Sequence, residues 1–349
     1  MHGMRHTWTP LAGLFLPLAI AAFSAPPQHH AADPNVMAAE DYLQQGQYAK
    51  ALEALELAAR MHPKGDQEVY IMLAVCHLNL EQGSAAVDAC ERGFQAFPGN
   101  TRIESYCSTL MQDVLSSDEL RARLTAALAR APNSGVLQKS LGKVLLDARA
   151  EDPRTEQLLA GARRALPHDA EAHYLYGKWA CVNQKEAVGV QALSTSLALT
   201  KPDNYAAVVL VNGMIGVAQD RLNHPRAAGL AFASALAAYG KMEPPVPEVP
   251  YQYVRFLVAR SEDANALRVN AVILRRNPQF APAHLEQAQL FFRAGRLEPS
   301  LAEAELALKY SPPDKTQLRS IHSFLVKASA ALGRSADVKL HQEWVDSNP

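Results

Sequence analysis

The side chains able to perform acid–base, nucleophilic or metal chemistry are spread along this chain without forming a recognisable motif. The twelve histidines are scattered, and the adjacent pair His29 and His30 lies in a polar lead-in typical of a linker. His173, His284 and His322 stand at similar places early in predicted helices, and such recurrence favours packing over metal ligation. The patterns G-x-S-x-G, H-E-x-x-H and G-x-G-x-x-G and a P-loop are absent from the sequence. We therefore expect neither a metal ion nor a cofactor.

Neighbouring carboxylates do not point to catalysis either. Glu303 and Glu305 point to different sides of a predicted helix, because residues two apart do not share a helix face. The pairs Glu40–Asp41 and Glu151–Asp152 are typical of solvated helix ends. General acid–base catalysis needs groups that converge on one place. The sequence therefore predicts a protein that is not an enzyme.

Composition narrows the class of protein and of partner. The chain has 349 residues, of which 48% are hydrophobic and 7% aromatic, values that suit packed helices. Its 34 basic and 35 acidic side chains give a net charge of −1. Binding to nucleic acid or to an anionic membrane surface requires a clustered positive charge that this balance does not supply. We expect a protein or peptide partner and no nucleic acid.

Residues 1–24 have the features of a secretory signal peptide. Arg5 precedes an apolar run over residues 10–23, and the small residues Ala22 and Ser24 predict cleavage after Ser24. This run is interrupted by Pro17 and is shorter than the roughly 20 residues needed to span a bilayer. We expect an exported protein, periplasmic or extracellular, with residues 25–31 as a linker and no stable membrane span after cleavage. Retention of the segment as an anchor stays open.

Prolines recur along the rest of the chain at nearly constant intervals. Each follows a segment rich in alanine and leucine with helical periodicity, and proline cannot continue a helix. Successive spacings are 35, 34, 35, 35, 42, 34, 34 and 37 residues. A fixed period of this length is the signature of a repeat architecture. The predicted repeats end near Pro63, Pro98, Pro132, Pro167, Pro202, Pro244, Pro278, Pro312 and Pro349.

Each interval has two halves, with small residues where two helices must approach closely. Ala39, Ala51 and Ala58 occupy these places in the first unit, and Gly46 stands between the halves, as Gly295 and Gly333 do later. This pattern resembles the tetratricopeptide repeat, a helix–turn–helix unit of 34 residues, over residues 32–349. The resemblance implies an all-α fold, a right-handed α-solenoid of about nine such repeats.

Two departures from the pattern stand out. The unit ending at Pro167 has the segment 148–154 in place of a turn glycine, and the 42-residue step contains the proline-rich segment 244–250. We interpret both departures as a looser joint within one continuous array and not as a domain boundary. The final helix, over residues 336–346, is polar enough to cap the open end of a stack.

Four cysteines become informative once the repeats are assigned. None forms C-x-x-C, and the haem-attachment pattern C-x-x-C-H is absent. Cys90 lies on the second helix of its unit and Cys107 on the next first helix, which should pack against it. Export to an oxidising compartment would allow a Cys90–Cys107 disulfide. Four buried thiols, including Cys76 and Cys181, are the alternative that stays open.

The resemblance also implies a binding surface, because first helices of such units form the inner wall of a superhelix. The carboxylate clamp of one subgroup is absent, since Val36, Glu40, Ile71, Val75, Ser105 and Thr109 occupy its positions. We expect the middle and C-terminal units to bind an extended segment or a helix of another envelope protein. The predicted partner-binding residues on this concave face are Tyr106, Lys143, Tyr174, Lys178, Met214, Tyr251, Arg255, Gln289, Arg293 and Lys327.

Three functions follow from this surface. The first is a non-catalytic interaction scaffold that holds a peptide or partner protein. The second is an accessory subunit that captures a glycan or a secretion-complex substrate. A ladder of aromatic side chains would favour sugars, but the aromatic residues of the inner wall are dispersed, namely Tyr106, Tyr174, Tyr251 and Phe324. The third and weakest is a structural oligomeriser, and the oligomeric state stays open.

Overall fold

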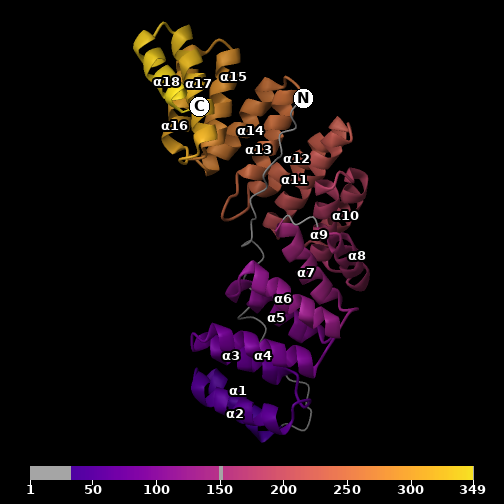
Figure 1. Cartoon of the computed structure of the whole chain (residues 1–349). Helices are drawn as coiled ribbons and strands as arrows, with labels where there is room; N and C mark the ends of the chain where they lie inside the picture. The colour runs from indigo at the N-terminus through magenta and orange to yellow at the C-terminus, as the bar shows by residue number, and fades with distance from the viewer. Residues whose placement is uncertain (1–32, 149–151, 349) are drawn as a thin grey trace. The chain divides into compact units, whose positions relative to one another are not determined.

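The computed structural model describes residues 33–148 and 152–348, in which all regular secondary structure is α-helical (Figure 1). The chain divides into two compact units, residues 1–179 (unit 1) and 180–349 (unit 2), and the division falls within α9. The predicted signal peptide (1–24), the linker (25–31) and the last predicted repeat end, Pro349, lie outside the described residues. None of the described helices is long and apolar enough to cross a membrane.

Eighteen helices alternate with short turns in these residues, as the proline intervals predict. The first nine are α1 (Pro34–Gln44), α2 (Tyr48–Met61), α3 (Glu68–Asn79), α4 (Gly83–Ala96), α5 (Thr101–Val114), α6 (Ser117–Arg130), α7 (Gly135–Asp147), α8 (Arg154–Ala165) and α9 (Ala170–Val182). The others are α10 (Glu186–Leu199), α11 (Tyr205–Arg221), α12 (Pro225–Tyr239), α13 (Glu248–Ala259), α14 (Asp263–Arg276), α15 (Ala281–Arg293), α16 (Leu297–Tyr310), α17 (Lys315–Ala331) and α18 (Ser335–Ser347).

The helices pack in the order expected of a helical repeat array. Within each unit a helix contacts the helices before and after it in the chain, for example α3 with α4 and α15 with α16. Some odd-numbered helices also contact the next odd-numbered helix, as α3 does with α5, α5 with α7 and α11 with α13. We call the odd-numbered helices A helices and the even-numbered ones B helices. This packing confirms the all-α, solenoid-type fold class, while the number of repeats and the handedness stay predictions.

Small residues are buried where the A and B helices cross. Ala39, Ala51 and Ala58 in unit 1 are at most 1% exposed, and Ala228 and Ala304 in unit 2 are fully buried. A larger side chain at such a position would overpack the helix pair, at a cost of about 1–3 kcal/mol. The small-residue pattern therefore sets how closely the helices approach.

Most of the described turns between an A helix and its B helix share one backbone conformation, the α5–α6 turn excepted. Gly46, Gly295 and Gly333 have φ near +70°, as their predicted place in the turn requires. The same left-handed conformation occurs in other units at residues that are not glycine, namely Glu81, Gln184, Asn223 and Ser261, with φ near +60°. The turn geometry is therefore set by the packing of the helix pair, and glycine only makes it less costly.

A side chain early in several A helices hydrogen bonds to the closing proline of the preceding unit. Gln138 donates to the Pro132 carbonyl at 2.7 Å, and ring nitrogens of His173 and His284 lie 3.1 and 2.9 Å from the carbonyls of Pro167 and Pro278. Each donor follows its proline by six residues. The recurrence of histidine here is thus a packing feature, as predicted. His322 differs, because its ring lies against Trp344 instead.

In the unit after Pro98 the side chain at this position accepts a hydrogen bond instead of donating one. Glu104 occupies the donor position, but a carboxylate accepts hydrogen bonds, so it takes one from the Gly99 backbone N–H at 3.1 Å. Gly99 has φ of +83°, a backbone conformation that glycine adopts readily. Ser134, the N-cap of α7, donates to the other oxygen at 2.5 Å. Burial raises the pKa of Glu104 above its usual range, although these two hydrogen bonds lower it.

The expectation of a loose joint at the 42-residue step is wrong. The loop between α12 and α13 is held by Arg276 of α14, which donates to the Tyr239 carbonyl, to the Met242 carbonyl at 2.6 Å, and to Glu243. The Tyr239 hydroxyl donates to Asn277 next to it. Other units have a short turn at this place. Here the longer loop between α12 and α13 is held against the helix pair α13–α14 by these contacts.

Candidate protein-interaction surfaces

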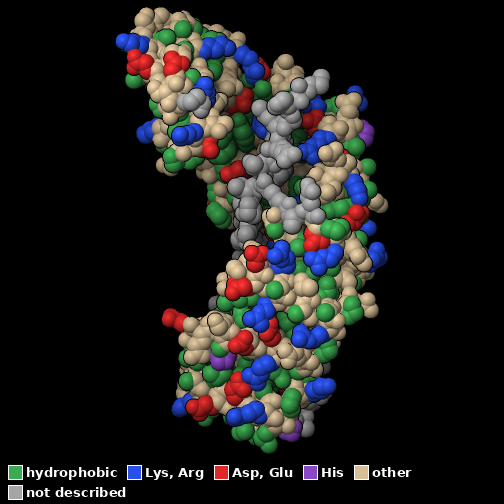
Figure 2. Space-filling view, in the orientation of Figure 1, with side chains coloured by type: hydrophobic (Ala, Val, Ile, Leu, Met, Phe, Trp, Pro, Cys, Tyr) green, Lys and Arg blue, Asp and Glu red, His purple; other side chains and the backbone are tan. Residues whose placement is uncertain are grey.

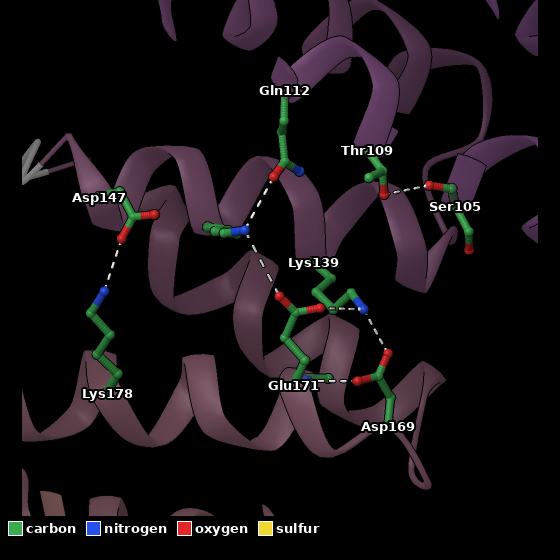
Figure 3. A network of polar contacts seen from close by, with 10 residues as sticks. Ser105, Thr109, Gln112, Lys139, Asp147, Asp169, Glu171 and Lys178 are labelled. Atoms are coloured by element: carbon green, nitrogen blue, oxygen red, sulfur yellow. Dashed lines mark hydrogen bonds and ion pairs between the residues drawn. The ribbon is translucent and has the colours of Figure 1, made fainter. Parts of the chain in front are cut away.

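The A helices of unit 1 share a row of polar side chains on α5, α7 and α9 (Figure 3). Lys143 of α7 lies between its neighbours, with Nζ 3.1 Å from Gln112 Oε1 on α5 and 3.9 Å from Glu171 Oε1 on α9. Lys178 of α9 reaches back to α7 and contacts Asp147 Oδ1 at 2.8 Å. The two predicted lysines are therefore brought into one row, but each already has a partner within unit 1.

Lys139, which the sequence analysis missed, completes this row. Its Nζ contacts Asp169 Oδ2 at 2.7 Å and Glu171 Oε2 at 2.9 Å (Figure 3). Burial lowers the pKa of Lys139, but the charges of Glu171 and Asp169 outweigh it and raise the pKa above its ordinary value. The signal was present in the sequence, because Lys139 and Asp169 are 30 residues apart, close to one repeat.

The row is electrically balanced. Three lysines, at 139, 143 and 178, face three carboxylates, at 147, 169 and 171. On the face of unit 1 seen in Figure 2, basic and acidic side chains are likewise interspersed. A surface of this kind offers hydrogen-bond donors and acceptors without a strong field of one sign, so it suits a partner of mixed polarity.

The two predicted tyrosines of unit 1 are half-buried side chains. Burial raises the pKa of the Tyr106 hydroxyl and raises that of Tyr174 much further, with Asp147 and Glu171 adding to the second shift. A hydroxyl so shielded stays protonated and retains its value as a hydrogen-bond donor. Tyr106 and Tyr174 therefore expose only part of their rings to a partner.

In unit 2 the predicted residues lie on α13, α15 and α17. Tyr251 donates to Glu286 Oε2 at 3.3 Å and packs edge-on against Phe280. Burial raises the pKa of both Tyr251 and Glu286. Arg255 is half-buried on α13, and its charge opposes both of these shifts.

The remaining predicted residues of unit 2 are also anchored. Arg293 pairs with Asp263 at 3.0 Å, Gln289 is half-buried, and the Lys327 ammonium lies 4.7 Å from the centroid of the Phe292 ring. The charged groups of Arg293 and Lys327, which the sequence predicts to contact a partner, thus already contact side chains of unit 2. An incoming partner would bind to their outer edges or displace these contacts.

The prediction for Met214 is wrong, because the side chain is only 7% exposed. Helix α11 is apolar on nearly all sides, with Val209, Val211 and Ala218 also buried, and it packs against α10, α12 and α13. A helix that is hydrophobic all round is enclosed by its neighbours and presents no open face. Met214 belongs to the core of unit 2.

The structure joins Cys90 of α4 to Cys107 of α5 as a disulfide, with Cα atoms 5.3 Å apart. Cys76 and Cys181 are buried free thiols, and burial raises the pKa of each to about 11. Since the thiolate is the reactive form, these two cysteines are poor nucleophiles at neutral pH. Unit 1 therefore has one covalent bond between neighbouring helix pairs and one inert thiol, Cys76, and unit 2 has the inert thiol Cys181.

His284 of α15 has a structural environment, since both of its ring nitrogens have partners within unit 2. His284 is 6% exposed, with Nδ1 2.7 Å from Glu303 Oε2 and Nε2 2.9 Å from the Pro278 carbonyl. Both ring nitrogens therefore face acceptors, and neither is free to accept a proton from a substrate. No cluster of three or more His, Cys, Asp or Glu side chains able to hold a metal ion occurs in residues 33–148 or 152–348.

Comparison with known proteins bears on one part of unit 1. A family match covers residues 42–107, which include α2, α3 and α4. These residues match the tetratricopeptide repeat family. No curated protein matches the chain.

Several solved structures resemble it at low identity. A tetratricopeptide repeat protein, YrrB, described as having an unusual peptide-binding site, is 16% identical, with a TM-score of 0.42 over 56% of this chain and 96% of that one. MamA of Desulfovibrio magneticus RS-1 is 16% identical, with a TM-score of 0.41 over 51% and 98%. The Cut9–Hcn1 assembly is 12% identical, with a TM-score of 0.49 over 86% and 55%. Similarities of this size assign neither a partner nor a function to the chain.

Proposed function

We propose that this chain is a non-catalytic scaffold that binds an extended segment or a helix of another protein on its A-helix surfaces. The observation that carries the proposal is the row across α5, α7 and α9, in which Lys143 and Lys178 are held by Gln112, Glu171 and Asp147. Side chains already held in one conformation lose little entropy when a partner contacts them. The tetratricopeptide repeat match over residues 42–107 supports the same function.

The chemistry of the row defines the kind of partner. Ser105 and Thr109 of α5 are exposed beside the half-buried lysines, and Lys143 and Lys178 have apolar stems that contribute contact area. The row is balanced in charge, so the partner supplies backbone amides and polar or apolar side chains instead of a highly acidic segment. We expect its binding to weaken little between low and physiological salt. Nothing in the described residues favours glycan capture, since Tyr106, Tyr174 and Tyr251 are half-buried.

The test replaces both lysines by methionine, in a Lys143→Met/Lys178→Met variant. Methionine keeps an apolar stem and removes the ammonium, whereas charge reversal would place a new carboxylate against Glu171 and Asp147. The matched control is Lys64→Met/Arg164→Met, which removes two exposed cations outside the row. A partner captured from envelope extract by the full protein is identified by mass spectrometry, and its affinity for each variant is measured by calorimetry.

We expect the row variant to bind about tenfold more weakly, the loss of two modest polar contacts, and the control to bind like the wild type. Circular dichroism checks that both variants keep the helical signal. Equal affinity of the row variant and the wild type would exclude this row as the binding surface.

We also propose that the protein is exported and that residues 1–24 are removed. The motivation is Arg5, the apolar run over residues 10–23 and the small residue Ser24. Mass spectrometry of the protein purified from its own cells should give an N-terminus at Ala25. Intact Met1 in a cytoplasmic fraction would contradict it.

A further inference from the structure

The last helix pair of unit 2 is held together by an unusual set of side chains. His322 of α17 stacks on Trp344 of α18, with ring centroids 4.1 Å apart and planes inclined by 11°. Its Nδ1 lies 3.0 Å from Nδ1 of His341, also on α18. Arg319 of α17 donates to the backbone carbonyls of Val345 and Asn348.

Helix α18 has little else to hold it in place. None of its residues is buried, whereas α17 buries Ile321, Leu325 and Ala328 in a core with α16. Leu340 of α18 is 62% exposed, and the predicted polar cap is thus a helix attached mainly through rings and hydrogen bonds. The two histidines are therefore among the side chains that hold α18 on α17.

The two Nδ1 atoms of His322 and His341 are close enough to share one hydrogen bond, which requires a single proton between them. The ring centroids are 5.1 Å apart and the Nδ1 atoms 3.0 Å apart, so each Nδ1 lies on the side of its ring that faces the other. A hydrogen bond between them needs one Nδ1 to donate and the other to accept. If both rings are protonated, two N–H groups and two positive charges face each other, and the contact becomes repulsive.

Charged groups on three helices surround the pair and act on the pKa values of the two rings. Asp337 on α18 and Glu305 on α16 act on His341 and raise its pKa, although burial keeps that pKa below the usual value. Burial and the neighbouring His341 lower the pKa of His322. Arg319, one turn before His322 on α17, is a further positive charge at this interface. With one ring protonated, its N–H can still donate to the other ring, whereas a second proton breaks the bond.

We propose that the His322–His341 pair is an acid-sensitive catch, which holds α18 on α17 at neutral pH and releases it when both rings are protonated. Because both rings accept protons more readily in the detached helix, the attachment weakens as the pH falls below about 6.5, the ordinary value for histidine. The catch would change the C-terminal end of unit 2 between a neutral and an acidic compartment.

Hydrogen exchange followed by mass spectrometry on the full chain tests this directly. After correction for the intrinsic pH dependence of exchange, we expect protection of residues 335–347 to fall about tenfold between pH 7 and pH 5, while α16 keeps its protection. A proton bound more tightly by one pH unit in the detached state changes the ratio of states tenfold. Unchanged protection of α18 at pH 5 would overturn the proposal.

The matched variant is His341→Gln, whose amide can still donate to His322 but does not titrate. We expect it to keep the α18 protection of the wild type at pH 7 and to lose the fall at pH 5. An undiminished fall at pH 5 in this variant would show that the pair is not responsible. Should the variant lose α18 at pH 7 as well, NMR titration of the wild-type imidazoles decides. The catch requires His322 and His341 to titrate together with the loss of α18 protection, and titration at a different pH excludes it.

Discussion

At the scale of single residues, the same position performs one structural task with different side chains. Gln138, His173 and His284 each bond the carbonyl of the proline six residues earlier, while Glu104 turns to the next N–H instead. The A-to-B turns do likewise, since Ser261 adopts the left-handed conformation of Gly295. A mutation at one of these positions can therefore be compared with the natural side chain at the equivalent position of another repeat.

Gly295 and Gly229 make a matched pair for the cost of backbone conformation. An added Cβ at Gly295 would meet nothing within 4 Å, but φ is +70°, so Gly295→Ala should lower the free energy of unfolding by about 1 kcal/mol. Gly229 lies within α12, where an added Cβ would make only an ordinary contact at 3.8 Å with Phe256. Gly229→Ala should raise the free energy of unfolding by about 0.5–1 kcal/mol. Urea unfolding of both variants, with opposite signs expected, distinguishes conformation from packing.

His284 should make the stability of unit 2 depend on pH. Burial lowers its pKa, but the hydrogen bonds to Glu303 and to the Pro278 carbonyl, with the Glu303 charge, raise it above the ordinary value. The folded state therefore binds the proton more tightly than the unfolded state. The contribution is fully present below about pH 6.5, the unfolded value, and is lost as the pH rises through the raised pKa.

The variant His284→Gln keeps a donor for the Pro278 carbonyl, as Gln138 provides in its own unit. It should lower the free energy of unfolding by about 1–2 kcal/mol at pH 6 and by less at pH 8.5. The control is His173→Gln, since His173 has the proline contact but its Nδ1 has no partner. A cost for His284→Gln that is equal at the two pH values would contradict a charged His284.

At the scale of elements, neighbouring helix pairs are joined by ion pairs about one repeat apart. Arg92 pairs with Glu56 at 2.7 Å in unit 1, and Arg293 pairs with Asp263 at 3.0 Å in unit 2. Exposed pairs of this kind contribute at most about 1 kcal/mol each. Their effect is therefore on register, because opposite charges meet only when the pairs stack in the observed order, while stability comes from the buried alanine and leucine contacts.

The Cys90–Cys107 disulfide adds a covalent link between α4 and α5. Its sequence separation is 17 residues, and a loop of this size predicts a stabilisation of roughly 3 kcal/mol in the chain-entropy model. Reduction of the purified protein should lower the denaturant midpoint of unit 1 accordingly, and a Cys90→Ala/Cys107→Ala variant should behave like the reduced protein. Peptide mapping without reductant that finds both thiols free would contradict the link.

At the scale of the molecule, the core of each unit is built from successive helix pairs. Unit 1 contains one large cluster that runs from Val36 of α1 to Leu145 of α7. In unit 2 separate clusters follow one another, one around Phe232 and Val254 and one around Ala304 and Ile321. Stability in such an array is approximately a sum over neighbouring interfaces. Local changes, such as release of α18, can therefore occur without unfolding the rest.

The sequence by itself determined the helix ends, the repeat period and most turn glycines, because proline and glycine act on their own backbone. It also put Lys143 and Lys178 on first helices of neighbouring repeats, and their role in partner binding stays a prediction. Only the tertiary structure decided that these lysines pair with Glu171 and Asp147, that Met214 is buried, and that His322 meets Trp344. Each of these outcomes depends on side chains of a neighbouring helix, whose proximity and rotamers the spacing along the chain does not specify.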